Sequence, residues 1–311
     1  MSRLVALSGP RRATAITYAI ALVLVACSAP VEHGDGREVG PTKVLPDAMR
    51  DLEGMSFAAG SGGPMLTFAV IGDFGTGERA QRRVARRMCR WRASNPYDLV
   101  VTTGDNIYPD GRRSYFGPRF FDPYSCLLGH GARFRATLGN HDVMTDNGSP
   151  EIDEPAFGMP RRNYVFRRGG VRFVMVNSNR LRLGWLAKAL EPQDGDIYTV
   201  VAMHHPVFSP GTHGSTPGFR PDLPRLFRAA GVDLVLAGHD HLYSVTKSLR
   251  GIRYVVTGGG GAPTYPCRDK WFVDVCRERR HFLYVTVTSE RMRVRAIPPT
   301  GEPFDRFRVA G

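Results

Sequence analysis

Residues 232–241, VDLVLAGHDH, join a short apolar run to a glycine and two histidines. The run is rich in Val and Leu and ends at Gly238, which is typical of a buried strand rather than a helix. Similar runs recur along the chain, at 65–71, 99–103, 134–138, 171–176, 197–202, 254–256, 282–287 and 292–297. The sequence therefore predicts a set of short buried strands.

Helical patterns lie between these runs. The clearest is 78–93, which carries an apolar stripe of Ala80, Val84, Met88 and Trp91 among its arginines. Shorter candidates are 181–190 and 223–230. Strands that alternate with helices predict an α/β fold with βαβ units and helices covering the sheets.

Polar side chains follow the predicted strands at one end. Each of them alone has an ordinary structural explanation, because Asp caps helices, Asn-His forms turns and a lone His is often hydrogen-bonded in a core. Five successive strand ends carry such residues: Asp73, Asp105, Asn140-His141-Asp142, His204-His205 and His239-Asp240-His241. Because the carboxyl ends of strands in α/β sheets gather the chemistry of the fold, we expect these side chains to form one site.

These five blocks stand in the order DxG, GDxxY, GNH[DE], VxxH and GHxH, at 73–75, 104–108, 139–142, 201–204 and 238–241. The set resembles the calcineurin-like metallophosphoesterase superfamily, and Tyr108 points to its purple acid phosphatase branch. His213, nine residues after His204, is similar to the tartrate-resistant type. The resemblance implies an α/β fold made of a two-sheet β-sandwich flanked by helices (αββα), with a metal site at the carboxyl ends of the strands.

The resemblance also implies a binuclear metal centre. One metal would be bound by Asp73, Asp105, Tyr108 and His241, and the other by Asp105, Asn140, His204 and His239. Phenolate and carboxylates suit Fe(III), whereas an amide oxygen and two imidazoles suit a divalent ion such as Fe, Zn or Mn. Such a pair would orient a phosphate ester and activate water as the attacking hydroxide.

His141 and His213 remain as groups outside the ligand set. An imidazolium near the leaving oxygen can donate a proton to it, so we expect both histidines to act on the substrate. Asp142, next to His141, is expected to orient and charge that ring. For His213 the alternative is a solvated loop residue, and His205 is expected to be structural.

The first 27 residues predict export. Arg3, Arg11 and Arg12 precede an apolar run, 13–26, that is too short for an ordinary membrane span. The run ends in LVAC, which resembles a bacterial lipobox and favours lipidation of Cys27 over cleavage of a plain secretory peptide near Ser28-Ala29. The expected location is a lipid-anchored position in the cell envelope, at the outer membrane or cell surface, and otherwise the periplasm or the medium.

The remaining chain divides into a Gly- and Pro-rich tether at 28–64 and one catalytic domain at 65–309. The four cysteines after Cys27 allow three pairings in an oxidising compartment. We favour Cys89 with Cys126 and Cys267 with Cys276, because the second pair closes a short segment that contains a turn.

Charge and composition limit the classes of function that are compatible with this chain. The 311 residues carry a net charge of +13 and an ordinary apolar content of 42%, which excludes a disordered, collagenous or coiled-coil chain. The arginines are spread without regular aromatic interleaving, so no specific nucleic-acid partner is expected. We expect a monomeric hydrolase of small phosphate monoesters that contacts a membrane only through Cys27. Alternatives are a phosphodiesterase or nucleotidase with the same metal centre, and a surface lipoprotein without catalysis.

Overall fold

The computed structural model describes residues 63–310. Their strands form two sheets, with orders β13-β12-β11-β1-β2-β3 and β10-β8-β9-β7-β6-β5-β4. The strands of the first sheet are β1 (Leu66–Ile71), β2 (Leu99–Thr102), β3 (Arg133–Arg135), β11 (Phe282–Val287), β12 (Arg291–Ile297) and β13 (Asp305–Ala310). Those of the second are β4 (Tyr164–Arg168), β5 (Val171–Val176), β6 (Tyr198–Met203), β7 (Leu234–Ala237), β8 (Tyr243–Thr246), β9 (Arg253–Thr257) and β10 (Val273–Arg277).

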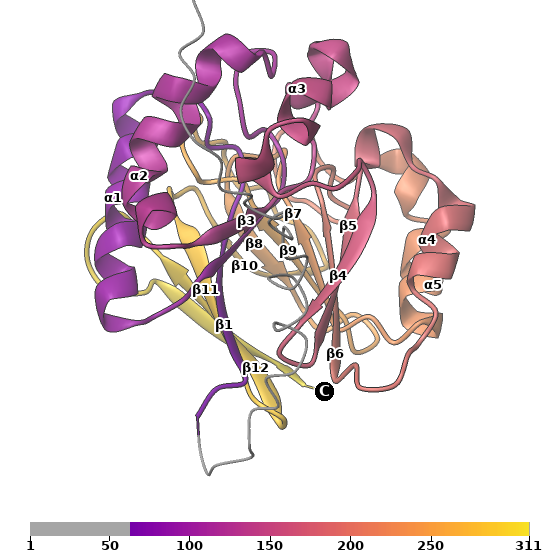
Figure 1. The fold of residues 1–311 in the computed structure, drawn as a ribbon. Coiled ribbons are helices and arrows are strands. Elements are labelled where there is room, and N and C mark those ends of the chain that lie inside the picture. Colours follow the sequence, from indigo (N-terminus) through magenta and orange to yellow (C-terminus); the bar gives the residue numbers. More distant parts are fainter. Residues whose placement is uncertain (1–62, 311) are drawn as a thin grey trace, which may run out of the picture. The chain divides into compact units, whose positions relative to one another are not determined.

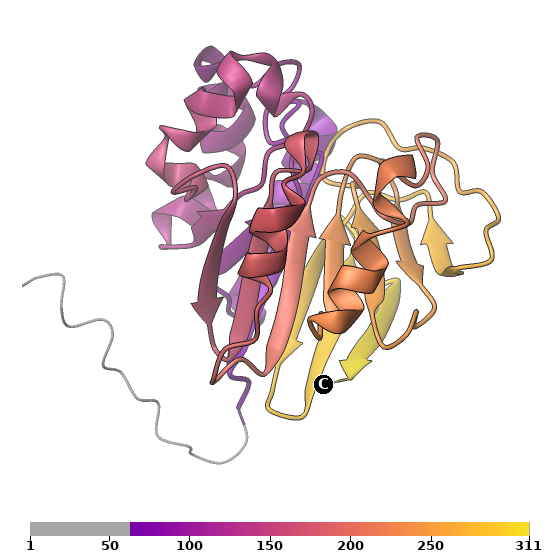
Figure 2. The same cartoon turned by 90° about the vertical axis from the view of Figure 1, so that its right-hand side faces the viewer.

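Helices cover the outer faces of both sheets (Figures 1 and 2). The α-helices are α1 (Arg79–Ser94), α2 (Asp122–Gly129), α3 (Ser149–Ile152), α4 (Leu183–Ala189) and α5 (Leu223–Ala229). Figure 1 shows α1 and α2 on the side of β1 and β3, and α4 and α5 beyond β5 and β6. This arrangement confirms the predicted two-sheet sandwich flanked by helices.

The core lies between the sheets and beneath the helices. Phe68 of β1 meets Phe173 of β5 edge to face, with ring centroids 5.2 Å apart, so the two sheets share one apolar layer. A second buried cluster, which includes Leu186 and Phe227, fixes α4 and α5 on the second sheet. In α1 the buried positions include Val84 and Met88, as the apolar stripe predicts.

Strands that the sequence pattern did not reveal are β4, β8, β10 and β13. Three of these are edge strands, where one side of the ladder meets solvent and charged residues interrupt the apolar run, as in YVFRR of β4 and VDVCR of β10. The run expected at 134–138 forms a shorter strand, β3, and then leads into the loop at Gly139. The pattern thus found most central strands and the edge strand β3, and it missed the other three edges and the central strand β8.

Two disulfides join Cys89 to Cys126 and Cys267 to Cys276, which confirms the favoured pairing. The first ties α1 to α2, and the second ties the loop before β10 to that strand. Among residues 63–310 no helix has the length and apolarity that crossing a membrane requires. The predicted signal segment with Cys27, and the tether apart from Gly63 and Pro64, lie outside the described residues.

Candidate metal centre

The candidate ligands gather where parallel strands of the two sheets end. β1, β2 and β3 run parallel in one sheet, and β5, β6, β7 and β9 run parallel in the other. Asp73 follows β1, Asp105 follows β2 and His204 follows β6, so the loops that carry them converge at one edge. The structure therefore brings together the residues of all five sequence blocks.

The backbone at this edge is strained where it presents ligands. Asp73, Asp105 and His239 adopt left-handed φ values of 55°, 50° and 71°, which L-residues adopt at a cost. Gly104 has φ of 88°, and a Cβ there would lie 2.7 Å from His204 Nδ1 and from the Gly139 backbone nitrogen. The glycine of the GDxxY block is thus required by both conformation and close packing.

A first group of candidate ligands, called the first ligand group below, consists of Asp73, Asp105, Tyr108 and His241. The phenol oxygen of Tyr108 lies 3.1 Å from His241 Nε2 and 3.5 Å from Asp73 Oδ1, and His241 Nε2 lies 3.4 Å from the same carboxylate oxygen. Asp73, Asp105 and His241 each offer a ligand atom within 4.8 Å of the others. Both carboxylates are buried, so the group forms an enclosed anionic set.

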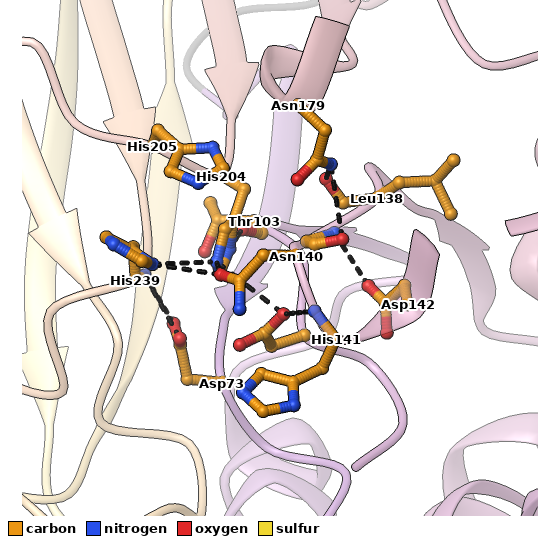
Figure 3. Close-up of polar contacts among 12 residues, drawn as sticks. Asp73, Thr103, Leu138, Asn140, His141, Asp142, Asn179, His204, His205 and His239 are labelled. Atoms are coloured by element: carbon orange, nitrogen blue, oxygen red, sulfur yellow. Dashed lines mark hydrogen bonds and ion pairs between the residues drawn. The ribbon is translucent and has the colours of Figure 1, made fainter. Parts of the chain in front are cut away.

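A second ligand group consists of Asn140, His204 and His239 (Figure 3). Asn140 Oδ1 lies 2.9 Å from His204 Nε2 and 3.0 Å from His239 Nδ1, and the two imidazole nitrogens are 3.3 Å apart. His204 Nε2 also lies 3.5 Å from Asp105 Oδ1. Asp105 therefore contacts the second group as well as belonging to the first.

Backbone carbonyls orient two of the imidazoles. Nδ1 of His204 lies 2.9 Å from the Thr103 carbonyl oxygen, and Nδ1 of His241 lies 2.8 Å from that of Pro263. A carbonyl accepts only from N–H, so this contact places the proton on Nδ1 and leaves the Nε2 lone pair toward the centre. That tautomer is the one that a metal ligand needs.

The electrostatics of the two groups differ. Burial raises the pKa of Asp105 to about 6, helped by the charges of Asp73 and Asp142 against the opposing effect of His204. Burial also raises the pKa of Asp73, but the hydrogen bond with His241 and nearby histidines outweigh it and the net shift is downward. Burial, followed by the charges of Asp73 and Asp105, raises the pKa of Tyr108 well above 10.

In the second group, burial and then the charges of His204 and His205 lower the pKa of His239 to about 3. Its imidazole is therefore neutral at ordinary pH, which is the form that binds metal ions. The donors of the whole centre are carboxylates, a phenol, an amide oxygen and imidazoles, a set that fits a hard cation on one side and a divalent ion on the other.

His141 lies outside both ligand groups but against the first. Its ring centroid is 4.5 Å from that of Tyr108, its Nδ1 lies 2.6 Å from the Pro109 carbonyl oxygen, and its backbone N–H donates to Asp105 Oδ1 over 3.0 Å. The Pro109 carbonyl orients the imidazole and places its proton on Nδ1. The ring is thus placed beside the first ligand group.

The role expected for Asp142 is corrected. Its carboxylate is buried and accepts hydrogen bonds from backbone N–H groups of Gly139, Asn106 and Ile107, at 2.7, 3.2 and 3.0 Å. It therefore braces the loops that carry Asp105 and Asn140, while the Pro109 carbonyl holds the His141 ring. His141 is the N-cap of the short helix Asp142–Met144, and Asp142 is its first residue. Because consecutive residues of a helix point in different directions, the side chains of His141 and Asp142 are separated.

His213 is exposed and lies over the second group. Its ring centroid is 4.4 Å from that of His239. The buried carboxylate of Asp240 holds this loop, because it accepts from the backbone nitrogens of His213 and Gly214 at 2.8 and 3.1 Å and from Ser209 Oγ. The sequence placed Asp240 at this strand end, between two candidate ligand histidines, but assigned it no role.

Tyr265 is a residue that sequence reasoning missed. Its ring stacks on His241 with centroids 4.3 Å apart and planes 16° apart, and its backbone N–H donates to the His241 carbonyl oxygen. It also meets the His213 ring edge-on at 5.3 Å. Tyr265 lies just before the segment closed by the Cys267–Cys276 disulfide, and no local pattern marks it as part of a site.

His205 also lies near the second group, with a ligand atom within 4.8 Å of His204 and His239. Its Nδ1 is 2.9 Å from Ser178 Oγ, and burial followed by the charge of His204 lowers its pKa to about 4. The structural role expected for His205 therefore stays a prediction, since its neutral ring also lies within reach of the two candidate ligands.

Carboxylate, phenol, amide and imidazole groups at the strand ends of a two-sheet sandwich define the metallophosphoesterase class of hydrolases. A family model described as "Calcineurin-like phosphoesterase" matches residues 66–243, and the chain belongs to this family.

Similar curated proteins are acid phosphatases. Tartrate-resistant acid phosphatase type 5 of Rattus norvegicus is 26% identical over 289 residues, which cover 76% of this chain and 88% of that protein. Purple acid phosphatase 3 of Arabidopsis thaliana is 26% identical and covers 74% of this chain and 73% of that protein. The predicted resemblance to purple acid phosphatases is confirmed.

Solved structures share the fold. Purple acid phosphatase PPD1 from yellow lupin superposes with a TM-score of 0.67 at 15% identity, over 79% of this chain and 53% of that chain. GAP50, the anchor in the inner membrane complex of Plasmodium, gives a TM-score of 0.69 at 16% identity, over 79% of this chain and 88% of that chain. At these identities the likeness concerns the fold alone.

Proposed function

We propose that this protein is a phosphatase of the purple acid phosphatase type that hydrolyses phosphate monoesters at a binuclear metal centre. The observation that carries the proposal is the meeting of two ligand groups at Asp105, one with a phenol and two carboxylates and one with an amide and two imidazoles. Phosphatase activity agrees with the acid phosphatases to which the chain is similar.

Asp73, Asp105, Tyr108 and His241 would hold Fe(III), and Asp105, Asn140, His204 and His239 would hold a divalent Fe, Zn or Mn ion. Bound there, the two cations supply positive charge that orients the phosphate and makes a water molecule acidic. The protein encloses the metal site, since the side chains of Asp73 and His204 are fully buried and that of Asp105 is nearly so.

The histidines outside the ligand set would handle the leaving group. His141 and His213 are held from different loops, so they can approach the substrate from two sides. Because the Pro109 carbonyl fixes the proton of the His141 ring on Nδ1, we assign Nε2 as the atom that, once protonated, donates to the leaving oxygen. His213 would hydrogen-bond the phosphate or share that proton transfer.

The predicted location and assembly belong to the same proposal. The protein would be exported, anchored through a lipidated Cys27 and monomeric, with the catalytic domain at 65–309 separated from the anchor by the tether. Release from isolated membranes by cleavage in the tether, with activity retained in the released part, is the expected result. Activity that stays with the membrane after such cleavage would contradict a lipid anchor as the only membrane contact.

The test is metal analysis with a visible spectrum and two nitrophenyl substrates on the full-length protein. We expect two metals per chain, a visible absorption from the Tyr108–Fe(III) pair, and faster turnover of the monoester than of the bis-ester. Tyr108→Phe should remove the absorption, whereas Tyr115→Phe, a tyrosine on a separate short helix, should keep it. Preference for the bis-ester would favour a phosphodiesterase, and two metals without hydrolysis of either substrate would favour a non-catalytic surface protein.

A further inference from the structure

Glu151 of α3 is a fully buried acid that has no role in the proposed chemistry. Its Oε2 accepts a hydrogen bond from Asn106 Nδ2 over 2.9 Å. Its Oε1 is also buried, and within residues 63–310 no donor lies in hydrogen-bond distance of that atom. An ionised carboxylate with an unpartnered buried oxygen is costly, because nothing compensates the loss of water around the charge. The surroundings of Glu151 thus disfavour its ionised form.

Asp142 is the neighbouring buried acid, and the two carboxyl groups differ in their donors. Asp142 accepts from the backbone nitrogens of Gly139, Asn106 and Ile107 at 2.7, 3.2 and 3.0 Å, and from Asn106 Nδ2 at 3.0 Å. Four N–H donors stabilise negative charge on Asp142, whereas Glu151 receives one. A proton that the two acids share therefore resides on Glu151.

No positive side chain takes the place of that proton. In the described part of the chain, neither Glu151 nor Asp142 forms an ion pair with Arg, Lys or His. Two ionised carboxylates around one amide nitrogen would repel each other in a buried place. Burial, followed by the charge of Asp142 and the hydrogen bond between the two side chains, raises the pKa of Glu151 well above its ordinary value. The charges and the donor pattern thus agree on a neutral acid.

The side-chain amide of Asn106 gives a further reason. Its Nδ2 lies 2.8 Å from the Thr137 carbonyl oxygen, 3.0 Å from Asp142 Oδ2 and 2.9 Å from Glu151 Oε2. An amide nitrogen carries only two hydrogens, so it cannot donate fully to three oxygens. An O–H of Glu151 that donates to Asp142 supplies the missing hydrogen.

This network borders the metal centre on two sides. Asn106 directly follows the candidate ligand Asp105 in the chain. The backbone N–H of Gly139, which directly precedes the candidate ligand Asn140, donates to Asp142 (Figure 3). A side chain that holds Asn106 and Asp142 together therefore fixes the backbone next to candidate ligands of both groups.

We propose that Glu151 is a positioning residue of the metal centre, which acts as a neutral carboxylic acid. Its O–H donates to Asp142 and its Oε2 accepts from Asn106, so the loops that carry Asp105 and Asn140 are held as one unit. The inference deepens the proposed function and rests on it, because the loops that Glu151 holds are those of the proposed metal ligands.

The experiment compares Glu151→Gln, Glu151→Met and the control Asp153→Met in the full-length protein. The amide of Gln both donates and accepts, as the neutral acid does, so Glu151→Gln should keep metal affinity and monoester kcat/KM within about twofold of wild type. Glu151→Met fills the space without a hydrogen-bonding group and should lower metal affinity and kcat/KM about tenfold or more. Asp153, an exposed acid two residues further along the chain, should have no effect on either.

Two further readouts do not depend on activity. The infrared difference spectrum between wild type and Glu151→Gln at neutral pH should contain the C=O band of one protonated carboxylic acid. Hydrogen exchange of the Gly139, Asn106 and Ile107 backbone amides, which donate to Asp142, should become about tenfold faster in Glu151→Met and stay unchanged in Glu151→Gln.

Absence of the carboxylic acid band, or a loss of metal affinity in Glu151→Gln as large as in Glu151→Met, overturns the neutral acid. Unchanged metal affinity in Glu151→Met, or an equal loss in the Asp153 control, overturns the positioning role. If Glu151→Met does not fold, the infrared band and the metal affinity of Glu151→Gln decide. If the wild-type protein hydrolyses no phosphate ester, the proposed function fails, and the infrared band and amide exchange alone support or overturn the role of Glu151.

Discussion

The two ligand groups of the metal centre lie side by side but differ in chemistry. The first, which contains Asp73, Tyr108 and His241, places two buried carboxylates and a phenol around one point. The second, which contains Asn140, His204 and His239, offers an amide oxygen and two imidazoles and contacts Asp105. The difference teaches that one chain can place an acid-rich and an imidazole-rich set of donors side by side through the strand ends that supply the acids.

Asp105 is the side chain that makes this comparison possible, because it contacts both groups. Asp105→Asn should therefore remove binding at both positions and lower kcat/KM by about 10⁴-fold, since the charge that holds two cations is lost. Metal analysis and monoester turnover check this result. Asp269→Asn, an exposed carboxylate in a loop, is the control and should keep both metals. Retention of two metals by the Asp105 variant would mean that the groups are not joined there.

Single-group variants should separate the two positions. We expect His204→Ala to lose the divalent metal and keep the Tyr108 absorption, and Asp73→Ala to lose the absorption together with the first metal. Each should lower kcat/KM by about 10³-fold, because a two-metal clamp needs both cations to stabilise the transition state. The measurement is metal stoichiometry with a visible spectrum. Loss of both metals in both variants would show that the groups bind as one unit.

His141 belongs to neither group, so its loss should separate chemistry from metal binding. His141→Ala should lower kcat by about 10²-fold through loss of proton donation while both metals stay bound. The effect should be larger for substrates with poorly acidic leaving groups, which need the proton most. Parallel loss of metal and activity would instead make His141 a structural residue that supports Tyr108, whose ring it contacts.

The sequence anticipated the ligand groups better than their surroundings. Ligands such as Asp73 and His239 follow buried strands directly, so the apolar runs alone place them at one edge of the fold. The position of Tyr265 against His241 depends on how loops cross that edge, which no local pattern specifies. Asp142 shows the same limit, because its position next to His141 in the sequence did not bring the two side chains into contact in the fold.

Edge strands were missed for a related reason. A central strand is buried on both faces and between two neighbours, so its residues are nearly all apolar, as in VRFVMV of β5. β13 borders solvent along one side and reads DRFRVA, a mixture of charge and apolar residues that resembles a loop. Exposure along one side therefore explains why β4, β10 and β13 were missed, whereas the buried central strand β8 was missed because its run YSVT is short and contains the polar residues Ser244 and Thr246.

The smallest expected effect concerns a buried histidine outside the centre. His204 and His281 are both fully buried, yet the carboxylates of Asp105 and Asp73 outweigh burial and raise the pKa of His204. At His281 no carboxylate outweighs burial, so burial lowers the pKa of its ring to about 4 from an ordinary 6.5. Burial keeps the ring neutral, and the ring lies between Thr257 Oγ1 at 3.0 Å and the Arg279 carbonyl oxygen at 2.9 Å.

Because the folded pKa of His281 is the lower one, the unfolded chain takes up its proton first as the pH falls. The free energy of unfolding should thus be unaffected by this group above pH 6.5 and should decrease between pH 6.5 and 4, by roughly 3 kcal/mol in total. Chemical denaturation across that range measures how steeply the free energy of unfolding changes with pH. This slope should be smaller in His281→Asn than in wild type, by the equivalent of up to one bound proton. The same substitution at the exposed His130 is the control. An unchanged slope in the His281 variant would place the acid sensitivity of the fold in other groups, with the carboxylates of the first ligand group as the next to test.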